Sequence, residues 1–208
     1  MARIETTDTS IKLVERRESD GYWVARWDFK PKHGSDGVFW YEEEAYNWIP
    51  SITDIQRTIT DWFNKQTDGV IQHGFIWKGI NVLLNDENKF NYKAITDEAA
   101  RRETAIAIWD KEHPDLAGKD VVYTEGKDDL GNVIMIPTFT GRPSSLLPIT
   151  LKLGESNLPE NFYVFANMTE LQDFFSAGVD HLLAAYESGW TKIATFDWSP
   201  YVKALEEL

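Results

Sequence analysis

The chain has 208 residues, a formal net charge of -13 and no cysteine. A chain of this length buries a core without disulfides or a structural metal. The missing cysteines exclude thiolate metal sites and cysteine nucleophiles. The excess of negative charge opposes binding to nucleic acid and to anionic membrane surfaces. No stretch approaches the apolar length of a membrane span, and the first ten residues lack the apolar core of a signal peptide. We therefore expect no nucleic-acid partner, no membrane insertion and no secretion by that route.

The first 47 residues predict β-strands. Segments 11–17, 22–29 and 38–46 are separated by stretches rich in Gly, Pro, Ser and Asp. Alternation in the second segment places four side chains on one face of its strand: Trp23, Ala25, Trp27 and Phe29. Because the connections are short, the three strands are expected to form an antiparallel meander.

A helix is predicted after the third strand. Ser51 is suited to cap it, and Asp54 three residues later completes a pattern close to a capping box. Apolar side chains then recur on one face, at Ile52, Ile55, Ile59, Trp62 and Phe63. The polar stretch 64–69 is expected to end this helix and to mark a boundary. The sequence thus predicts an N-terminal β module with its helix in residues 1–66, for assembly or attachment, and a second module in residues 67–208.

The second module is expected to begin with a hairpin and a long helix. Residues 74–84 (GFIWKGINVLL) predict the hairpin, with Lys78 and Gly79 at its turn. The helix is expected from Asn85 or Asp86 to about residue 111. Its inner side is predicted at Phe90, Ala94, Ile95, Ala99, Ile106 and Trp109.

Residues 113–145 are rich in turn-forming residues and predict either an inserted hairpin or a functional loop. Strands are expected at 147–153 and 162–165, followed by an amphipathic helix that ends at Gly189 and a last helix capped by Ser199. The predicted class is α+β. An N-terminal antiparallel β meander plus a helix precedes an α+β module of β-hairpins and amphipathic helices.

The chain shows no motif for catalysis or for cofactor binding. Its four histidines, at positions 33, 73, 113 and 181, do not occur at metal-ligand spacings. Neither a glycine-rich phosphate loop nor a nucleophile elbow is present. The sequence therefore predicts no catalytic residue, no metal ligand and no cofactor, and a protein that is not an enzyme.

Three consecutive glutamates lie in the third predicted strand. Glu42 and Glu44 would share one side of it, where two carboxylates can shift each other's pKa or bind a hard cation. The alternative is a solvated run of charge that protects a sheet edge, with Glu43 on the other side. The first alternative would fit a metal-dependent hydrolase, which is the least favoured function.

Nine tryptophans are an excess for this length. Aromatic side chains dominate protein–protein contacts and also stack on sugar rings. The candidate interface residues are Trp23, Trp27, Phe29, Trp40 and Trp48. They would form the core of the β module, a contact surface between subunits, or a platform for a sugar.

Several segments resemble a small domain of virion-associated proteins from tailed phages and prophages of Bacteroides-type gut bacteria, of the crAss-like kind. The segments are residues 74–99 (GFIWKGINVLLNDENKFNYKAITDEA), 147–154 (LPITLKLG), 168–190 (MTELQDFFSAGVDHLLAAYESGW) and 197–201 (DWSPY). Residues 50–71 and the strand GYWVARWDF resemble the N-terminal part of the same proteins. Residues 113–145 depart from the pattern, because a longer insertion stands where the family has a short connection.

The resemblance implies a non-enzymatic building block of the virion, such as a capsid-decorating head fibre or a tail-associated protein. It implies a homo-oligomer that contacts capsid or tail proteins after assembly in the host cytoplasm. The alternative function is a binding module for a glycan or receptor on the host surface. The resembling residues are apolar and capping residues, so the resemblance assigns no catalytic site.

Overall fold

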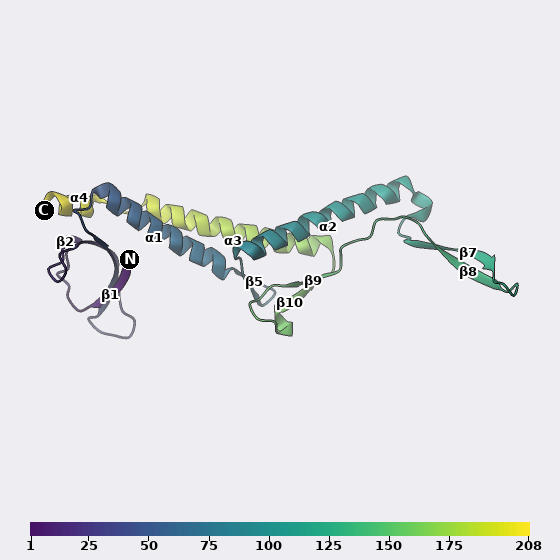
Figure 1. The fold of residues 1–208 in the computed structure, drawn as a ribbon, viewed down its shortest axis with the longest axis horizontal. Helices are drawn as coiled ribbons and strands as arrows, with labels where there is room; N and C mark the ends of the chain where they lie inside the picture. Colours follow the sequence, from purple (N-terminus) through teal and green to yellow (C-terminus); the bar gives the residue numbers. More distant parts are fainter. The chain divides into compact units, whose positions relative to one another are not determined.

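The computed structural model describes residues 1–208 and confirms the predicted α+β class (Figure 1). The chain forms two compact units. Unit 1 consists of residues 1–69 and 185–208, and unit 2 consists of residues 70–184. The two boundaries fall inside helices α1 (Ile52–His73) and α3 (Met168–Ala194).

Unit 1 contains a four-stranded antiparallel sheet of β1 (Ala2–Thr6), β2 (Val14–Arg16), β3 (Trp23–Pro31) and β4 (Phe39–Tyr46), in the order β1-β4-β3-β2. The predicted meander is confirmed as β2–β3–β4. Strand β1, which pairs with β4, was not predicted from the sequence. Its addition makes β4 an inner strand.

A bulge in β3 moves Phe29 to the face opposite Trp27. The register of β3 against β4 shifts between Trp27 and Lys30, and Asp28 has a φ of 56°. Aspartate tolerates this left-handed conformation better than most residues do. The ring of Phe29 consequently lies 5.3 Å from that of Tyr41, whereas Trp27 contacts Trp62. The prediction that Phe29 and Trp27 share a face is therefore wrong.

Helix α1 begins as predicted but continues further. Ser51 and Asp54 form the expected capping box, with the Asp54 N–H donating to Ser51 Oγ at 3.2 Å and the Ser51 N–H donating to Asp54 Oδ2 at 3.0 Å. The polar stretch 64–69 does not end the helix. Asn64, Lys65, Gln66 and Asp68 are exposed on the helix surface, whereas Thr67 is half-buried, and the buried Ile71 lies further along the same helix.

The core of unit 1 combines the sheet, α1 and the C-terminal helix α4 (Ser199–Glu206). Its buried members are Val14, Ala25, Trp27, Tyr46, Ile55, Ile59, Trp62 and Tyr201. The compact units therefore differ from the predicted modules 1–66 and 67–208, because residues 185–208 belong with unit 1. Trp198, and not the predicted Ser199, occupies the N-cap position of α4, and its side chain makes no capping hydrogen bond.

Gly189 lies within α3 and does not end it. A Cβ atom at this position would lie 2.1 Å from Thr67 Oγ1 of α1. The glycine is therefore explained by the close approach of two helices in unit 1, and the predicted helix end at Gly189 is wrong.

Unit 2 begins with the predicted hairpin of β5 (Phe75–Trp77) and β6 (Ile80–Val82). Its turn residues Lys78 and Gly79 both have positive φ, at 45° and 87°. These signs are those of the turn that suits a two-residue hairpin. Helix α2 (Asp86–Glu112) follows with Asn85 as its cap, close to the predicted bounds.

A second small sheet pairs β9 (Ile149–Lys152) with β10 (Phe162–Phe165), as the two predicted strands imply. Short 3-10 helices at Pro114–Leu116 and Pro159–Asn161 complete the unit. Its core contains an aromatic cluster of Phe75, Trp77, Tyr92, Phe165 and Phe174. Phe90, predicted on the inner side of α2, is 74% exposed, because Tyr92 and Thr96 face inward instead.

Of the two alternatives for residues 113–145, the structure contains the hairpin. Strands β7 (Val121–Lys127) and β8 (Val133–Phe139) pair along their full length. No other helix or strand of unit 2 makes more than a marginal contact with them. The side chains on both faces of the hairpin are exposed or half-exposed. In Figure 1 the hairpin follows α2 in the chain and has no other element of unit 2 packed against it.

Candidate interaction surfaces

The acidic run on β4 is largely buried and ion-paired. Glu42 and Glu43 are almost inaccessible, because β4 is an inner strand. The Arg3 guanidinium donates to Glu42 Oε1 at 2.8 Å. Glu44 instead pairs with the amino group of Met1 at 2.5 Å. The interpretation of this run as a solvated charge at a sheet edge is therefore wrong.

Glu43 and Arg26 form the centre of a buried ion-pair network on one face of the sheet. Arg26 Nε lies 2.7 Å from Glu43 Oε2, and its Nη1 lies 2.5 Å from Glu15 Oε1 and 3.0 Å from the carbonyl oxygen of Lys12. Burial disfavours the charged guanidinium, but the hydrogen bonds to Glu15 and Glu43 outweigh it and raise the pKa of Arg26. Removing one partner of such a pair costs several kcal/mol, about 3–5 in comparable cases.

This arrangement gives the carboxylates a structural role. Each buried carboxylate already has a cationic partner from the same unit. No three histidine, aspartate or glutamate side chains lie close enough together to hold a metal ion. Glu42 and Glu44 share a side of β4, as expected, but each contacts a different cation.

Two of the five candidate interface residues belong to the core of unit 1. Trp27 is 1% exposed and packs edge-on against Trp62, with ring centroids 6.3 Å apart. Trp23 is partly buried against the same cluster. The sequence left open a core, a contact surface or a sugar platform for these two tryptophans, and the structure places them in or against the core.

Trp40 lies on β4 between cationic side chains of the two neighbouring strands. The Arg3 guanidinium is 3.9 Å from the ring centroid, and Lys30 Nζ is 5.3 Å from it. Such cation–π contacts contribute about 0.5–1 kcal/mol at exposed sites. A sugar stacking on the ring face under Arg3 would have to displace this guanidinium.

Phe29 is half-exposed and lines a small cavity in unit 1. The cavity is about 340 Å³ and is otherwise lined by Thr6, Asp8, Thr9, Ile11, Leu13 and Phe39. The polar members come from the segment at and after the end of β1. Because of the bulge at Asp28, the Phe29 ring lies on the face of the sheet opposite Trp27, and it does not join Trp27 and Trp40 in one surface.

Trp48 stands in the connection between β4 and α1, where it is 53% exposed. Its ring touches Tyr46 edge-on at 5.9 Å, and the next residue, Ile49, is 59% exposed. Pro50, directly after them, is fully buried. Two large apolar side chains thus lie at the surface directly before a buried proline, and we call Trp48 and Ile49 the Trp48 patch.

The five candidates do not form one platform. Trp23 and Trp27 are internal, Trp40 carries a cation, Phe29 is on the opposite face, and Trp48 lies beyond the end of β4. Sequence reasoning missed Ile49, although it directly precedes the proline that fixes this connection. It also missed the exposed apolar side chains of the β7–β8 hairpin, although the run 133–136 signalled a strand.

Unit 2 contains an apolar pocket of about 160 Å³ between α2 and the first half of α3. Phe75, Tyr92, Phe174 and Leu182 line it, and Lys89 stands among the lining residues. Burial raises the pKa of Tyr92 to about 12, and its hydroxyl donates to the carbonyl oxygen of Lys152 at 3.2 Å. No carboxylate lines this pocket, and its surface is apolar except at Tyr92, Lys89 and Lys93.

Comparison of the chain with protein-family models, curated proteins and solved structures gives no significant match. No helix combines the length and the apolar character that crossing a bilayer requires. These comparisons assign no family, so the geometry of the chain is the structural ground for a functional proposal.

Proposed function

We propose that the chain is a non-enzymatic structural component of a tailed-phage virion. Its place is that of a capsid-decorating head fibre or of a tail-associated protein. The resemblance in residues 21–29, 50–71, 74–99, 147–154, 168–190 and 197–201 supports the virion role. The surface of unit 1 supports a role carried by protein–protein contacts.

The Trp48 patch is the structural observation that carries the proposed role in protein–protein contacts. Tryptophan is among the residues that contribute most to binding at protein interfaces. A large aromatic ring that is exposed beside a second exposed apolar side chain offers apolar area that a partner can bury. These properties fit a contact surface for a capsid or tail protein.

The other two functions have less support. A glycan platform built on Trp23, Trp27 and Trp40 is disfavoured by the burial of Trp27 and by the guanidinium over Trp40. A hydrolase using Glu42 and Glu44 is disfavoured because both carboxylates are engaged in ion pairs.

Immunogold electron microscopy of purified particles tests the virion role. An antibody raised against the recombinant chain is expected to label the capsid or the tail, and the labelled position selects between head fibre and tail component. Particles that stay unlabelled, beside particles labelled by an antibody to the major capsid protein, would refute the proposal.

Variants test the Trp48 patch itself. In particles grown with variant chains, Trp48→Ala is expected to lower labelling at least about tenfold, as the loss of an interface hot spot would. Tyr22→Ala removes another exposed aromatic side chain of unit 1 and is expected to leave labelling unchanged. Equal labelling with both variants would remove the Trp48 patch from the contact.

A further inference from the structure

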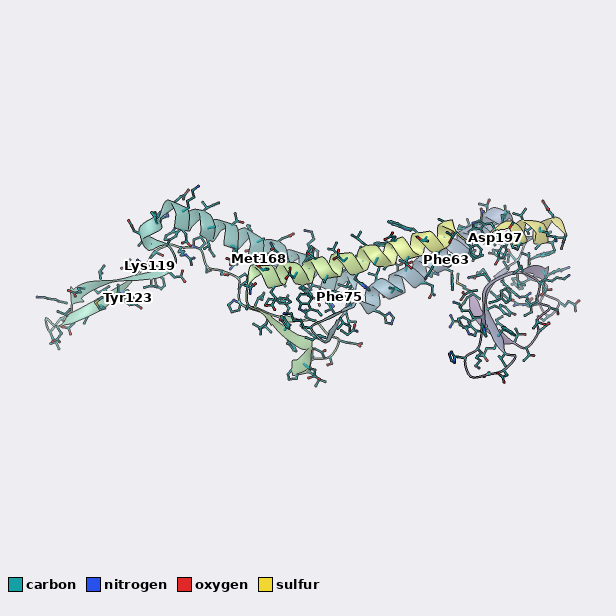
Figure 2. The ribbon with its side chains drawn as sticks, turned by 180° about the vertical axis from the view of Figure 1, so that it is seen from behind. Phe63, Phe75, Lys119, Tyr123, Met168 and Asp197 are labelled. Atoms are coloured by element: carbon teal, nitrogen blue, oxygen red, sulfur yellow. The ribbon has the colours of Figure 1, made fainter.

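The β7–β8 hairpin exposes an apolar surface that a single chain leaves uncovered. Every residue of β8 is exposed, and Phe139 reaches 83%. On β7, Tyr123 is also exposed, and Figure 2 shows it in the hairpin with no other segment alongside. A two-stranded hairpin has marginal stability in water by itself, whereas three or more strands with an apolar face are stable.

The two outer edges of the hairpin differ. The Thr140 N–H donates to the Asp120 carbonyl oxygen, and the Asp128 N–H donates to the Asn132 carbonyl oxygen, both at 3.0 Å. Because hydrogen-bonded pairs alternate along an antiparallel ladder, even-numbered residues of the hairpin bond inward and odd-numbered residues point their N–H and C=O groups outward. The outward N–H groups of β7 make no hydrogen bond in the structure.

One edge is blocked and the other is open. Pro137 is an outward residue at the middle of β8, so this edge lacks a donor where an added strand would need one. The outward residues of β7 are Val121, Tyr123, Glu125 and Lys127, and none is a proline. The β7 edge therefore presents backbone donors along its whole length, whereas the β8 edge lacks one at Pro137.

The sequence of β7 fits an antiparallel copy of itself in one register. With Thr124 opposite Thr124 of a second copy, all seven residues overlap, Glu125 faces Tyr123, and Lys127 faces Val121. A shift of two residues one way places Glu125 opposite Glu125, and like charges directly opposite each other are destabilising. A shift the other way leaves Lys127 outside the ladder.

We propose that β7 is a dimerisation strand, which pairs with β7 of a second copy to form a four-stranded sheet. The pairing is two-fold, so each copy uses the same edge, and Pro137 blocks the outer strands of the new sheet. The assembly therefore closes at two copies through this contact. This inference stands independently of the virion role.

The absence of cysteine makes a direct test of the register possible. In the proposed dimer, Thr124 sits on the two-fold axis in a non-hydrogen-bonded pair, where Cα atoms are about 4.5 Å apart and a disulfide can form. Thr124→Cys is expected to give a disulfide-linked dimer under mild oxidation. Thr138 is also exposed but lies on β8, so Thr138→Cys is expected to give no disulfide-linked dimer under the same conditions. Equal cross-linking of the two variants would overturn the proposal.

A matched pair of edge variants tests the pairing without cross-linking. Glu125 and Met135 face each other in the hairpin, and both point their N–H outward, so proline at either position leaves the internal ladder intact. In sedimentation velocity over a concentration series, Glu125→Pro is expected to abolish the dimer, and Met135→Pro is expected to keep it. A wild-type chain that stays monomeric, or two variants that dimerise alike, would refute the dimerisation strand, whatever the outcome of the particle labelling.

Discussion

The Glu170 side chain of unit 2 links α3 to β10 and to the β5–β6 turn through hydrogen bonds. It lies in the first turn of α3, where its own N–H donates to Asn167 Oδ1 at 3.0 Å. Its carboxylate accepts from the Tyr163 hydroxyl of β10, and from Lys78 Nζ of the β5–β6 turn at 2.9 Å. The hydrogen bond from Tyr163 and that from Lys78 lower the pKa of Glu170 from 4.5 to about 2.

This shift predicts a pH-dependent effect of Glu170→Gln. Because the folded pKa lies below the ordinary value, the carboxylate stabilises the fold fully above about pH 4.5, and this contribution is lost as the pH falls toward 2. The variant is therefore expected to melt at a lower temperature than the wild type at pH 7, and the difference is expected to narrow between pH 4.5 and pH 3.

Circular dichroism melts across this pH range provide the measurement. Glu160→Gln is the control, because Glu160 is exposed and forms no ion pair in the structure. It is expected to melt with the wild type at every pH. A Glu170→Gln deficit that is constant with pH would assign the side chain a role other than the charge interaction.

For single residues, the sequence predicted helix caps and turns better than the face of a strand on which a side chain lies. Ser51, Asp54, Asn85 and the Lys78–Gly79 turn act through neighbours within four residues, so their patterns are visible in the chain. The direction of Phe29 was not visible, because a single left-handed residue reverses the alternation after it. The same holds for the burial of the acidic run, which follows from the unpredicted pairing with β1.

Among the elements, α1 and α3 are defined by how closely they approach each other. The contact between Gly189 and Thr67 leaves no space for a side chain at position 189. Gly69 also lies inside a helix, but a Cβ atom added there would meet nothing within 4 Å. Alanine at position 69 therefore tests helix propensity alone, whereas alanine at position 189 tests helix propensity together with packing against Thr67.

Gly69→Ala is expected to stabilise the protein by about 0.5–1 kcal/mol, which is the gain of alanine over glycine in a helix. Gly189→Ala has the same gain, but it forces Thr67 or the helix backbones apart at a cost of about 1–3 kcal/mol. We therefore expect Gly189→Ala to destabilise unit 1. Urea unfolding of both variants gives the comparison.

The double variant Gly189→Ala with Thr67→Ala checks the cause. Removing Thr67 Oγ1, the atom nearest the added Cβ, is expected to recover part of the lost stability, which makes the two substitutions non-additive. Strict additivity would show that the clash is not with Thr67.

Both errors in the predicted helix ends have one origin. A polar stretch and an isolated glycine are typical of helix ends, but they also occur where a helix turns outward or meets another helix. Which of these applies depends on contacts between Thr67 and Gly189, which are far apart in the chain. Periodicity within one helix carries no information about such contacts.

Over the whole molecule, unit 1 is made from two distant parts of the chain. The Tyr201 hydroxyl donates to the carbonyl oxygen of Arg26 at 2.9 Å, and both residues are buried. Burial raises the pKa of Tyr201, so the hydroxyl keeps its proton and remains a donor. The sequence predicted residues 67–208 as one module because nothing local assigns the last residues to the N-terminal sheet.

Removing residues 195–208 is expected to unfold unit 1 and to leave unit 2 folded. The deletion takes Tyr201 and Phe196 from the core around Trp27, whereas the aromatic cluster of unit 2 loses no member. Hydrogen exchange is expected to show lost protection in β3 and β4 and retained protection in α2.

Residues 70–184 produced alone serve as the control and are expected to retain the exchange pattern that unit 2 has in the full chain. Protection of β3 and β4 that survives the deletion would show that the sheet and α1 fold without the C-terminal helix. Equal loss in both units would show that the two fold as one cooperative body.

The division of unit 1 also sets an order of events during translation. A ribosome makes residues 1–69, then the whole of unit 2, and only afterwards Tyr201, which completes the first core. Unit 2 therefore has its full sequence available for folding while unit 1 is still incomplete. Residues 70–184 form the loop between the two parts of unit 1. Once this loop has folded as unit 2, it loses less conformational entropy when unit 1 closes, so folding of unit 2 lowers the entropic cost of completing unit 1.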